Sequence, residues 1–213
     1  MRSALPPAPT TPGTEASFET GDLSASGRIV RAALGRFATR GISGTTVRDI
    51  AADAGVSPAL VIHHFGSKEE LRRECDRRVI AFLRAKSQSR PGQVLDATFS
   101  RFGAYAARML TEDSPESRSL FDELVAVARM VVDHAAEDGS LRASSDPDAQ
   151  AVALVVLGLA PFAFTASLAH WANDDAEAAM RRLAVPIAEI YTTGLLRDRA
   201  VLEAARATEA SGA

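Results

Sequence analysis

The side chains best suited to bind a charged partner are gathered near the N-terminus. Residues 28–68 contain six Arg or Lys residues and only two acidic ones, Asp49 and Asp53. The whole chain has a formal net charge of −3, so any surface for a polyanion must be this local patch. Such a patch suits contact with phosphate groups, and binding through it weakens steeply as salt is added. Taken singly, each Arg could equally serve only to keep a helix surface in water.

Two short helices joined by a tight turn are predicted within this patch. The first has one apolar face, because its apolar residues fall three or four apart: Val47, Ile50, Ala51 and Ala54. Gly55 provides the backbone freedom for a sharp turn. Ser57 can cap the second helix, with Pro58 at its first position. A third helix begins directly afterwards, since Ser67 and Glu70 have the spacing of a capping box.

A helix, a Gly-centred turn and a second short helix form a helix-turn-helix, whose second helix enters the DNA major groove. An isolated pattern of this kind is more often a plain pair of packed helices. Here three linked segments agree: IVRAALGRFATRG, TTVRDIAADAGVS and HHFGSKEEL. Through them, residues 28–71 closely resemble the N-terminal domain of the TetR family of transcriptional regulators. The resemblance implies double-stranded DNA as the partner and a palindromic operator as the site.

The exposed side of the second helix, residues 57–64, is the predicted recognition surface. The resemblance implies that Ala59 and Leu60 approach bases. It also implies phosphate contacts from three further residues, Thr46, His63 and Lys68. The full set of predicted DNA-binding residues is Thr46, Arg48, Ser57, Pro58, Ala59, Leu60, Ile62, His63 and Lys68.

Two departures from the common family pattern affect specificity. Pro58 stands where many members have Lys, and Ile62 where many have Tyr. The recognition helix therefore lacks a long side chain for bidentate hydrogen bonding to a base. Specificity is expected to rest on apolar contacts with thymine methyl groups, on Arg48 and on DNA shape. His63 and His64 point about 100° apart on a helix, so they are not expected to share a metal ion, and phosphate contact or packing is favoured. No metal site and no cofactor are expected.

Helical periodicity continues along the rest of the chain, and no run alternates with period two for long enough to indicate a strand. We therefore expect an all-α protein of about nine helices. A flexible arm is predicted for residues 1–23, a three-helix helix-turn-helix domain for 24–66, a larger helical domain for 67–200 and a tail for 201–213. The resemblance implies that the larger domain binds a ligand and forms the dimer. It also implies that its first helix transmits ligand-induced motion.

Aromatic and Met residues in the larger domain can line an apolar cavity, although each of them could equally fill the core. Three of the candidates, Tyr105, His134 and His170, could anchor a ligand through polar groups. The pocket candidates are Phe99, Phe102, Tyr105, Met109, Phe121, Met130, His134, Phe162, His170 and Trp171. The last two long helices are the expected homodimer interface. A two-fold dimer would place two recognition helices about one DNA turn apart.

These features favour a ligand-responsive transcriptional repressor that is released from its operator by a small apolar or amphipathic effector. An all-helical enzyme is the weaker alternative, because the sequence has no H-E-x-x-H, P-loop or G-x-S-x-G motif. A membrane-attached regulator is another, since residues 149–173 contain no Asp, Glu, Lys or Arg. The Ala content and acidic flanks of that stretch favour a buried interface helix instead, with Pro161 expected to kink it. A single cysteine and no signal peptide suit a cytoplasmic, nucleoid-associated protein.

Overall fold

Ten α-helices account for most of the residues that the structure describes. This computed structural model describes residues 24–87, 99–142, 144–194 and 200–211, and no strand occurs within these ranges. The all-α fold predicted from the sequence is thereby confirmed. The flexible arm predicted for residues 1–23 lies outside the described residues.

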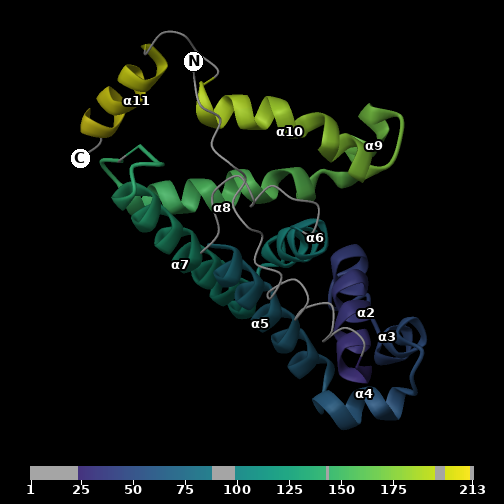
Figure 1. Ribbon diagram of the computed structural model, residues 1–213. Helices are drawn as coiled ribbons and strands as arrows, with labels where there is room; N and C mark the ends of the chain where they lie inside the picture. The colour runs from purple at the N-terminus through teal and green to yellow at the C-terminus, as the bar shows by residue number, and fades with distance from the viewer. Residues whose placement is uncertain (1–23, 88–98, 143, 195–199, 212–213) are drawn as a thin grey trace, which may run out of the picture. The chain divides into compact units, whose positions relative to one another are not determined.

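Three helices form the N-terminal part of the fold (Figure 1): α2 (Ala25–Arg40), α3 (Val47–Ala54) and α4 (Pro58–Phe65). Each begins after a residue whose side chain accepts a backbone hydrogen bond, namely Ser24, Thr46 and Ser57. Because the cap at Ser57 fixes its start, α4 lies within a residue of the range 57–64 that the sequence predicts. The apolar faces of α2 and α3 meet in a core where Ile29 and Ile50 are fully buried.

Four more helices continue the same core: α5 (Lys68–Ser87), α6 (Phe99–Leu110), α7 (Pro115–Glu137) and α8 (Pro147–Ala163). The helix α2 packs on α6 as well as on α3, so the helix-turn-helix and these four helices share one apolar cluster. Phe37 of α2 and Tyr105 of α6 are both fully buried in it, with ring centroids 6.4 Å apart. A displacement of α6 therefore reaches α2 directly, because close-packed interiors transmit strain.

The chain divides into two compact units between Ala163 and Phe164. The second unit contains α9 (Thr165–Ala172), α10 (Ala176–Thr192) and α11 (Ala200–Ser211), and α9 packs against α10. The uncharged stretch at residues 149–173, predicted to be one kinked helix, is thus divided between two helices. Pro161, where we expected a kink, lies inside α8, and the break comes at Phe164, which has φ −111° and ψ 23°. Pro161 removes one hydrogen bond to the preceding turn, and α8 ends two residues after it.

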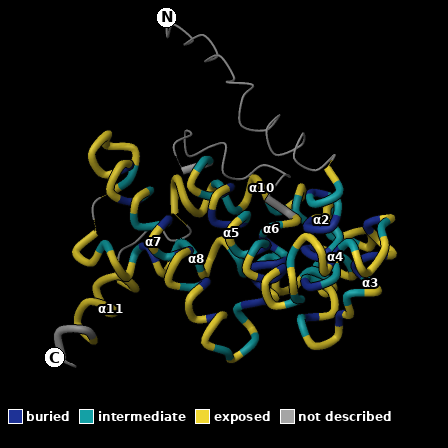
Figure 2. The backbone as a smooth tube through the Cα atoms, turned by 90° about the horizontal axis from the view of Figure 1, so that it is seen from below, coloured by how far each residue is buried: buried dark blue, intermediate teal, exposed yellow. Residues whose placement is uncertain are grey.

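The uncharged stretch at residues 149–173 covers most of α8 and α9. Among the described residues, no single helix is both long and apolar enough to cross a bilayer, and α8 and α9 reach that length and composition only when counted together. Within the single chain this stretch is far from buried, since Val156 is 53% exposed and Leu157 is 57% exposed (Figure 2). Burial of α8, as the sequence predicted, requires contacts beyond those of one chain.

Candidate nucleic-acid interface

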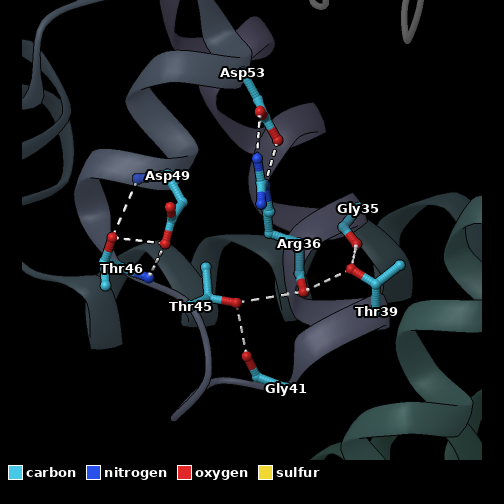
Figure 3. Close-up of polar contacts among 8 residues, drawn as sticks. All are labelled: Gly35, Arg36, Thr39, Gly41, Thr45, Thr46, Asp49 and Asp53. Carbon is cyan, nitrogen blue, oxygen red and sulfur yellow. Dashed lines mark hydrogen bonds and ion pairs between the residues drawn. The ribbon is translucent and has the colours of Figure 1, made fainter.

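A reciprocal cap starts the first helix of the helix-turn-helix (Figure 3). The Thr46 hydroxyl accepts a hydrogen bond from the backbone N–H of Asp49 at 3.2 Å. The Asp49 carboxylate accepts one from the backbone N–H of Thr46 at 3.0 Å and one from the Thr46 hydroxyl at 2.7 Å. These bonds, the one from the hydroxyl first, lower the pKa of the Asp49 carboxyl. Thr46 remains exposed, but its hydroxyl proton is already donated within the protein.

A glycine in the left-handed conformation makes the turn between α3 and α4. Gly55 has φ 64° and ψ 40°, and its N–H donates to carbonyl groups in the last turn of α3. Ser57 then caps α4, since its hydroxyl accepts from the N–H of Leu60 at 3.2 Å. Pro58 occupies the first turn of α4, where no N–H is needed. The turn at Gly55 and the cap at Ser57 that the sequence predicts are therefore present.

The helix α4 turns one narrow face inward and presents the rest to solvent. Val61 is 1% exposed, whereas its neighbour Ile62 is 45% exposed. Leu60 is half-buried, so this residue is less accessible than the sequence predicted. Figure 1 shows α4 at one extremity of the first unit, away from α8. The exposed residues predicted to contact DNA from this helix and its cap are Ser57, Pro58, Ala59, Ile62 and His63.

At least three of the six cations counted in the sequence bind groups of the protein itself. Arg36 forms a two-point ion pair with Asp53, with nitrogen–oxygen distances of 2.5 and 2.6 Å (Figure 3). The hydrogen bond from Arg36 lowers the pKa of the Asp53 carboxyl. Arg28 donates to the carbonyl of Ala54 at 3.2 Å. The charge that faces a phosphate is therefore smaller than the sequence count implies, and its exposed members are Arg31, Arg40 and Arg48.

Lys68 is the third of these engaged cations, and it joins the start of α5 to the loop before α3. Its ammonium group donates to the carbonyl of Ile42 at 2.9 Å and to that of Thr45 at 3.1 Å. Thr45 is itself buried, and its hydroxyl donates to the carbonyl of Gly41 at 2.8 Å. A lysine has three N–H groups, so one remains for the phosphate contact that the sequence predicts. Lys68 thus fixes the loop that carries Thr46, whatever else it contacts.

The end of α6 reaches the same loop. Glu112, which follows α6, accepts a hydrogen bond from the backbone N–H of Ile42 at 3.4 Å. Gly41 has φ 70°, and a β-carbon there would lie 2.8 Å from the Glu112 carboxylate and 3.0 Å from the Arg108 guanidinium. Sequence reasoning missed this contact, because its partners lie 70 residues apart and neither belongs to a local motif. The loop of residues 41–46 is therefore held from α5 and from α6.

The histidines and the cysteine show no arrangement for metal chemistry. His63 and His64 are both exposed, with ring centroids 5.7 Å apart. No group of three or more His, Cys, Asp or Glu residues that could hold a metal ion occurs in the described part of the chain. Cys75 is buried on α5, and this burial raises the pKa of its thiol.

The predicted pocket residues near α6 lie together. Tyr105 and Met109 are fully buried, and Phe102 packs against the same core. Phe162 of α8 lies against α6 at Gly103, where an added β-carbon would be 2.5 Å from its ring. The absence of a side chain at Gly103 therefore allows α8 to approach α6. These four aromatic and Met residues line one region of the interior, and their contact with a ligand stays a prediction.

The remaining pocket candidates are dispersed. Phe121 is half-buried on α7, and the side chain of Phe99 lies outside the described residues. Four others are exposed on α7 or in the second unit: Met130, His134, His170 and Trp171. The structure thus gathers some of the predicted set around α6 and leaves the rest apart from them.

Two family models match this arrangement of a helix-turn-helix and a larger helical body. The model described as "Bacterial regulatory proteins, tetR family" matches residues 29–75, which cover α2 to the first part of α5. The model described as "Tetracyclin repressor-like, C-terminal domain" matches residues 98–197, which cover α6 to α10.

Individual proteins agree with the family models. The chain is 35% identical over 202 residues to the HTH-type transcriptional regulatory protein RaaS of Mycobacterium tuberculosis, covering 88% of this chain and 94% of that protein. It is 43% identical over 60 residues to the HTH-type transcriptional repressor KstR2 of the same species, covering 28% of this chain and 30% of KstR2. The fold is similar to that of a Clostridium perfringens protein proposed to regulate fatty acid metabolism, with a TM-score of 0.56, 16% identity, and coverage of 80% of this chain and 100% of that one. The chain therefore belongs to the TetR family of transcriptional regulators.

Proposed function

We propose that this protein is a dimeric repressor that binds a palindromic operator and leaves it when a small apolar or amphipathic effector binds. Its family and relatives indicate a transcriptional regulator and not an enzyme, and KstR2 is named a repressor. The observation that carries the proposal is the outer face of α4, which is exposed and contains no acidic residue. Such a face can enter a major groove without repelling phosphates. Under this proposal, the protein acts in the cytoplasm, on the DNA of the nucleoid.

DNA recognition would combine apolar base contacts with polar backbone contacts. Ile62 is the largest exposed apolar side chain of α4, and its branched chain suits the methyl group of thymine. Arg48 on α3 is exposed and can donate to a base edge or a phosphate. His63 and the remaining N–H of Lys68 would face the DNA backbone. Because at least three of the six cations are bound within the protein, the number of phosphates neutralised per subunit would be small.

A second copy of the chain is the partner that the C-terminal helices favour. In the second unit, Phe164 is 60% exposed and Val185 is 65% exposed, and α10 has Ala179 as its fully buried residue. In the first unit, α8 exposes Val156 and Leu157. Large exposed apolar side chains mark interaction surfaces on soluble folds. An isologous dimer through the last long helices would cover them and set the spacing of the two α4 helices.

The effector response would use the two links that hold the loop of residues 41–46. Lys68 connects this loop to α5, and Glu112 connects it to the end of α6. Tyr105 and Met109 on α6 are among the residues expected near the effector. An effector that displaces α6 would therefore pull on the loop that starts α3, and through α3 it would reorient α4. The effector can weaken operator binding only by the factor by which it binds the displaced arrangement more tightly than the original one.

Operator binding tests this proposal directly. A duplex is selected from random DNA by the full chain, and its affinity is measured by fluorescence anisotropy beside a scrambled duplex of the same composition. We expect a preference of roughly 1,000-fold or more for the selected duplex at moderate salt. Ile62→Ala should reduce this preference, while Val201→Ala on α11 should leave it unchanged. Equal affinity of the native chain for both duplexes rejects the proposal.

A further inference from the structure

A buried glycine lies in the interior of α6, where the helix itself does not require one. In a helix interior, glycine is less favourable than alanine, because its backbone loses more freedom on folding. Gly103 is buried, and its φ is not positive, so no turn explains its presence. The reason for a glycine at this position must therefore lie in what packs against it.

The ring of Phe162 on α8 occupies the space that a side chain at position 103 would fill. A β-carbon on Gly103 would lie 2.5, 2.6 and 2.7 Å from three atoms of this ring. Because carbon atoms in contact are about 3.5–4.0 Å apart, the ring and the β-carbon would have to separate by about 1 Å. A β-carbon on Gly35, inside α2, would meet no neighbouring atom within 4 Å in the described part of the chain. The close approach is therefore specific to Gly103.

One side of α8 faces the rest of the first unit. Ala151 is fully buried, and Val155 and Leu159 pack against the core. Phe162 lies on the same side, because these four residues are spaced three or four apart. Elsewhere on its surface, α8 carries the exposed apolar residues that the proposed dimer would cover. In that dimer, α8 would lie between α6 and the second copy of the chain.

The start of α8 is attached to α7, whereas its end rests on α6. Ala151 is fully buried, and Asp148 pairs with Arg129 of α7 at 2.8 Å. At the other end, Pro161 removes one helical hydrogen bond shortly before α8 ends. At 1.5 Å per residue, the distance from Ala151 to Phe162 is about 16 Å, so a displacement of about 1 Å at Phe162 would tilt α8 by roughly 3–4°.

The helix α6 also holds the DNA-binding helices. It packs on α2, where the Tyr105 and Phe37 rings meet, and the Glu112 side chain that follows it accepts from the N–H of Ile42. A continuous path of contacts thus leads from α4 through α3, α2 and α6 to α8. The contact between Gly103 and the Phe162 ring is a link in this path.

We propose that Gly103 is a positioning residue that sets the separation of the two recognition helices in the dimer, by letting Phe162 close on α6. The inference rests on the proposed dimeric repressor and adds the residue that fits it to one spacing of half-sites. A side chain at position 103 tilts α8, and the two DNA-binding parts then no longer meet both half-sites at once. Binding of one subunit to one half-site stays unchanged, because the helix-turn-helix itself is not altered.

Operator binding by the full chain tests this role on two duplexes, the selected palindrome and a duplex with one half-site. Gly103→Ala should weaken binding to the palindrome about tenfold and to the half-site by less than about twofold, because only simultaneous binding depends on spacing. In a Phe162→Ala background, Gly103→Ala should cost less than about threefold on the palindrome, since the added β-carbon then meets no ring. Gly35→Ala is the matched control and should change both affinities by less than about twofold.

The distance between the two recognition helices gives a second readout without DNA. A spin label on Ala59→Cys reports it by electron–electron resonance, because Ala59 is exposed on α4 and the native Cys75 is buried. Gly103→Ala should shift the distance between the two labels of a dimer, and Gly35→Ala should not. Phe162→Trp enlarges the ring on the other side of the contact, so it should have the same effects as Gly103→Ala even if that variant does not fold.

The outcomes separate this inference from the proposed function. If Gly103→Ala and Phe162→Trp weaken the palindrome and the half-site equally, or match Gly35→Ala on both, the spacing role is rejected and the repressor stands. If the native chain prefers no duplex, repression is rejected, and the label distance decides the inference. A shift caused by Gly103→Ala that disappears in the Phe162→Ala background supports the role of Gly103, and an unchanged distance rejects it.

Discussion

The helix-turn-helix and the C-terminal helices differ in where their apolar side chains go. In α2, α3 and α4, residues such as Phe37, Ile50 and Val61 are at most 1% exposed. In α9 and α10 several large apolar residues are exposed, with Trp171 53% exposed and Ile190 49% exposed. Helix packing within one chain completes the first core but not the second.

Under the proposed function, this difference separates the surface for DNA from the surface for a second copy of the chain. The helix-turn-helix buries its apolar residues and shows DNA a small, mixed surface on α4, which suits a polar and wet interface. The C-terminal helices keep a large apolar surface, which suits an interface that excludes water. Even the Arg182 guanidinium there lies over an apolar ring, 4.3 Å from the centroid of Trp171.

A charge placed on the exposed apolar surface should have the largest effect. Val185→Asp on α10 is expected to convert the dimer to a monomer and to weaken operator binding roughly 100-fold or more, because a monomer loses the gain from two linked half-sites. Light scattering after gel filtration gives the mass, and anisotropy gives the affinity. Val201→Asp on α11 is the matched control, because Val201 is 63% exposed and Val185 is 65% exposed. If both variants stay dimeric, the contrast between the two regions does not mark the interface.

Two neighbouring residues of α4 sharpen the same contrast within one helix. Val61→Ala should lower the free energy of unfolding by about 2 kcal/mol, because it leaves a cavity in a packed core. Ile62→Ala should change the unfolding free energy by less than about 0.5 kcal/mol. The same Ile62 variant should weaken operator binding by about tenfold through the loss of an apolar base contact. Urea unfolding and anisotropy separate the two effects, and a reversed pattern would mean that α4 faces DNA with another side.

The local features of the helix-turn-helix could be predicted from sequence because they arise between near neighbours. Gly55 makes the turn and Ser57 caps α4 as their types and spacing indicate. The capping box predicted from the spacing of Ser67 and Glu70 is only half formed. The N–H of Glu70 does donate to the Ser67 hydroxyl at 3.1 Å, but the Glu70 carboxylate pairs with Arg73 and the Ser67 N–H donates to Phe65.

Contacts between distant segments could not be predicted in this way. The bonds from Lys68 to the carbonyls of Ile42 and Thr45, and from the Ile42 N–H to Glu112, depend on how α5 and α6 pack, which no local pattern encodes. Similarly, a charge count cannot show that Arg36 is paired with Asp53. The break at Phe164 was missed for the related reason that a proline predicts a disturbance but not whether the chain kinks or starts a new helix.

The reciprocal cap of α3 should matter for stability more than for DNA binding. Thr46→Ala removes the hydroxyl that caps the N–H of Asp49, and it should lower the free energy of unfolding by about 1 kcal/mol. Thr46→Ser retains the hydroxyl and should restore most of the loss. Urea unfolding provides the measurement for both variants. If Thr46→Ala instead weakens operator binding without affecting stability, the predicted phosphate contact of Thr46 is its main role.

The ion pair between Arg36 and Asp53 gives the smallest expected effect, and its sign follows from the pKa of the carboxyl. The hydrogen bond from Arg36 lowers the pKa of Asp53 in the folded protein below its value in the unfolded chain. The pair therefore stabilises the fold above the unfolded pKa, and this contribution is lost as the pH falls through the folded pKa. Asp53→Asn should therefore make the free energy of unfolding less dependent on pH in the acid range. The change should be smaller than the loss of unfolding free energy caused by Thr46→Ala, because the ion pair is partly exposed. Arg36→Gln should reduce the pH dependence equally, and the double variant should add nothing further. Additive effects in urea titrations across acid pH would show that the two residues act separately, and Arg36 would then be counted again among the cations that face DNA.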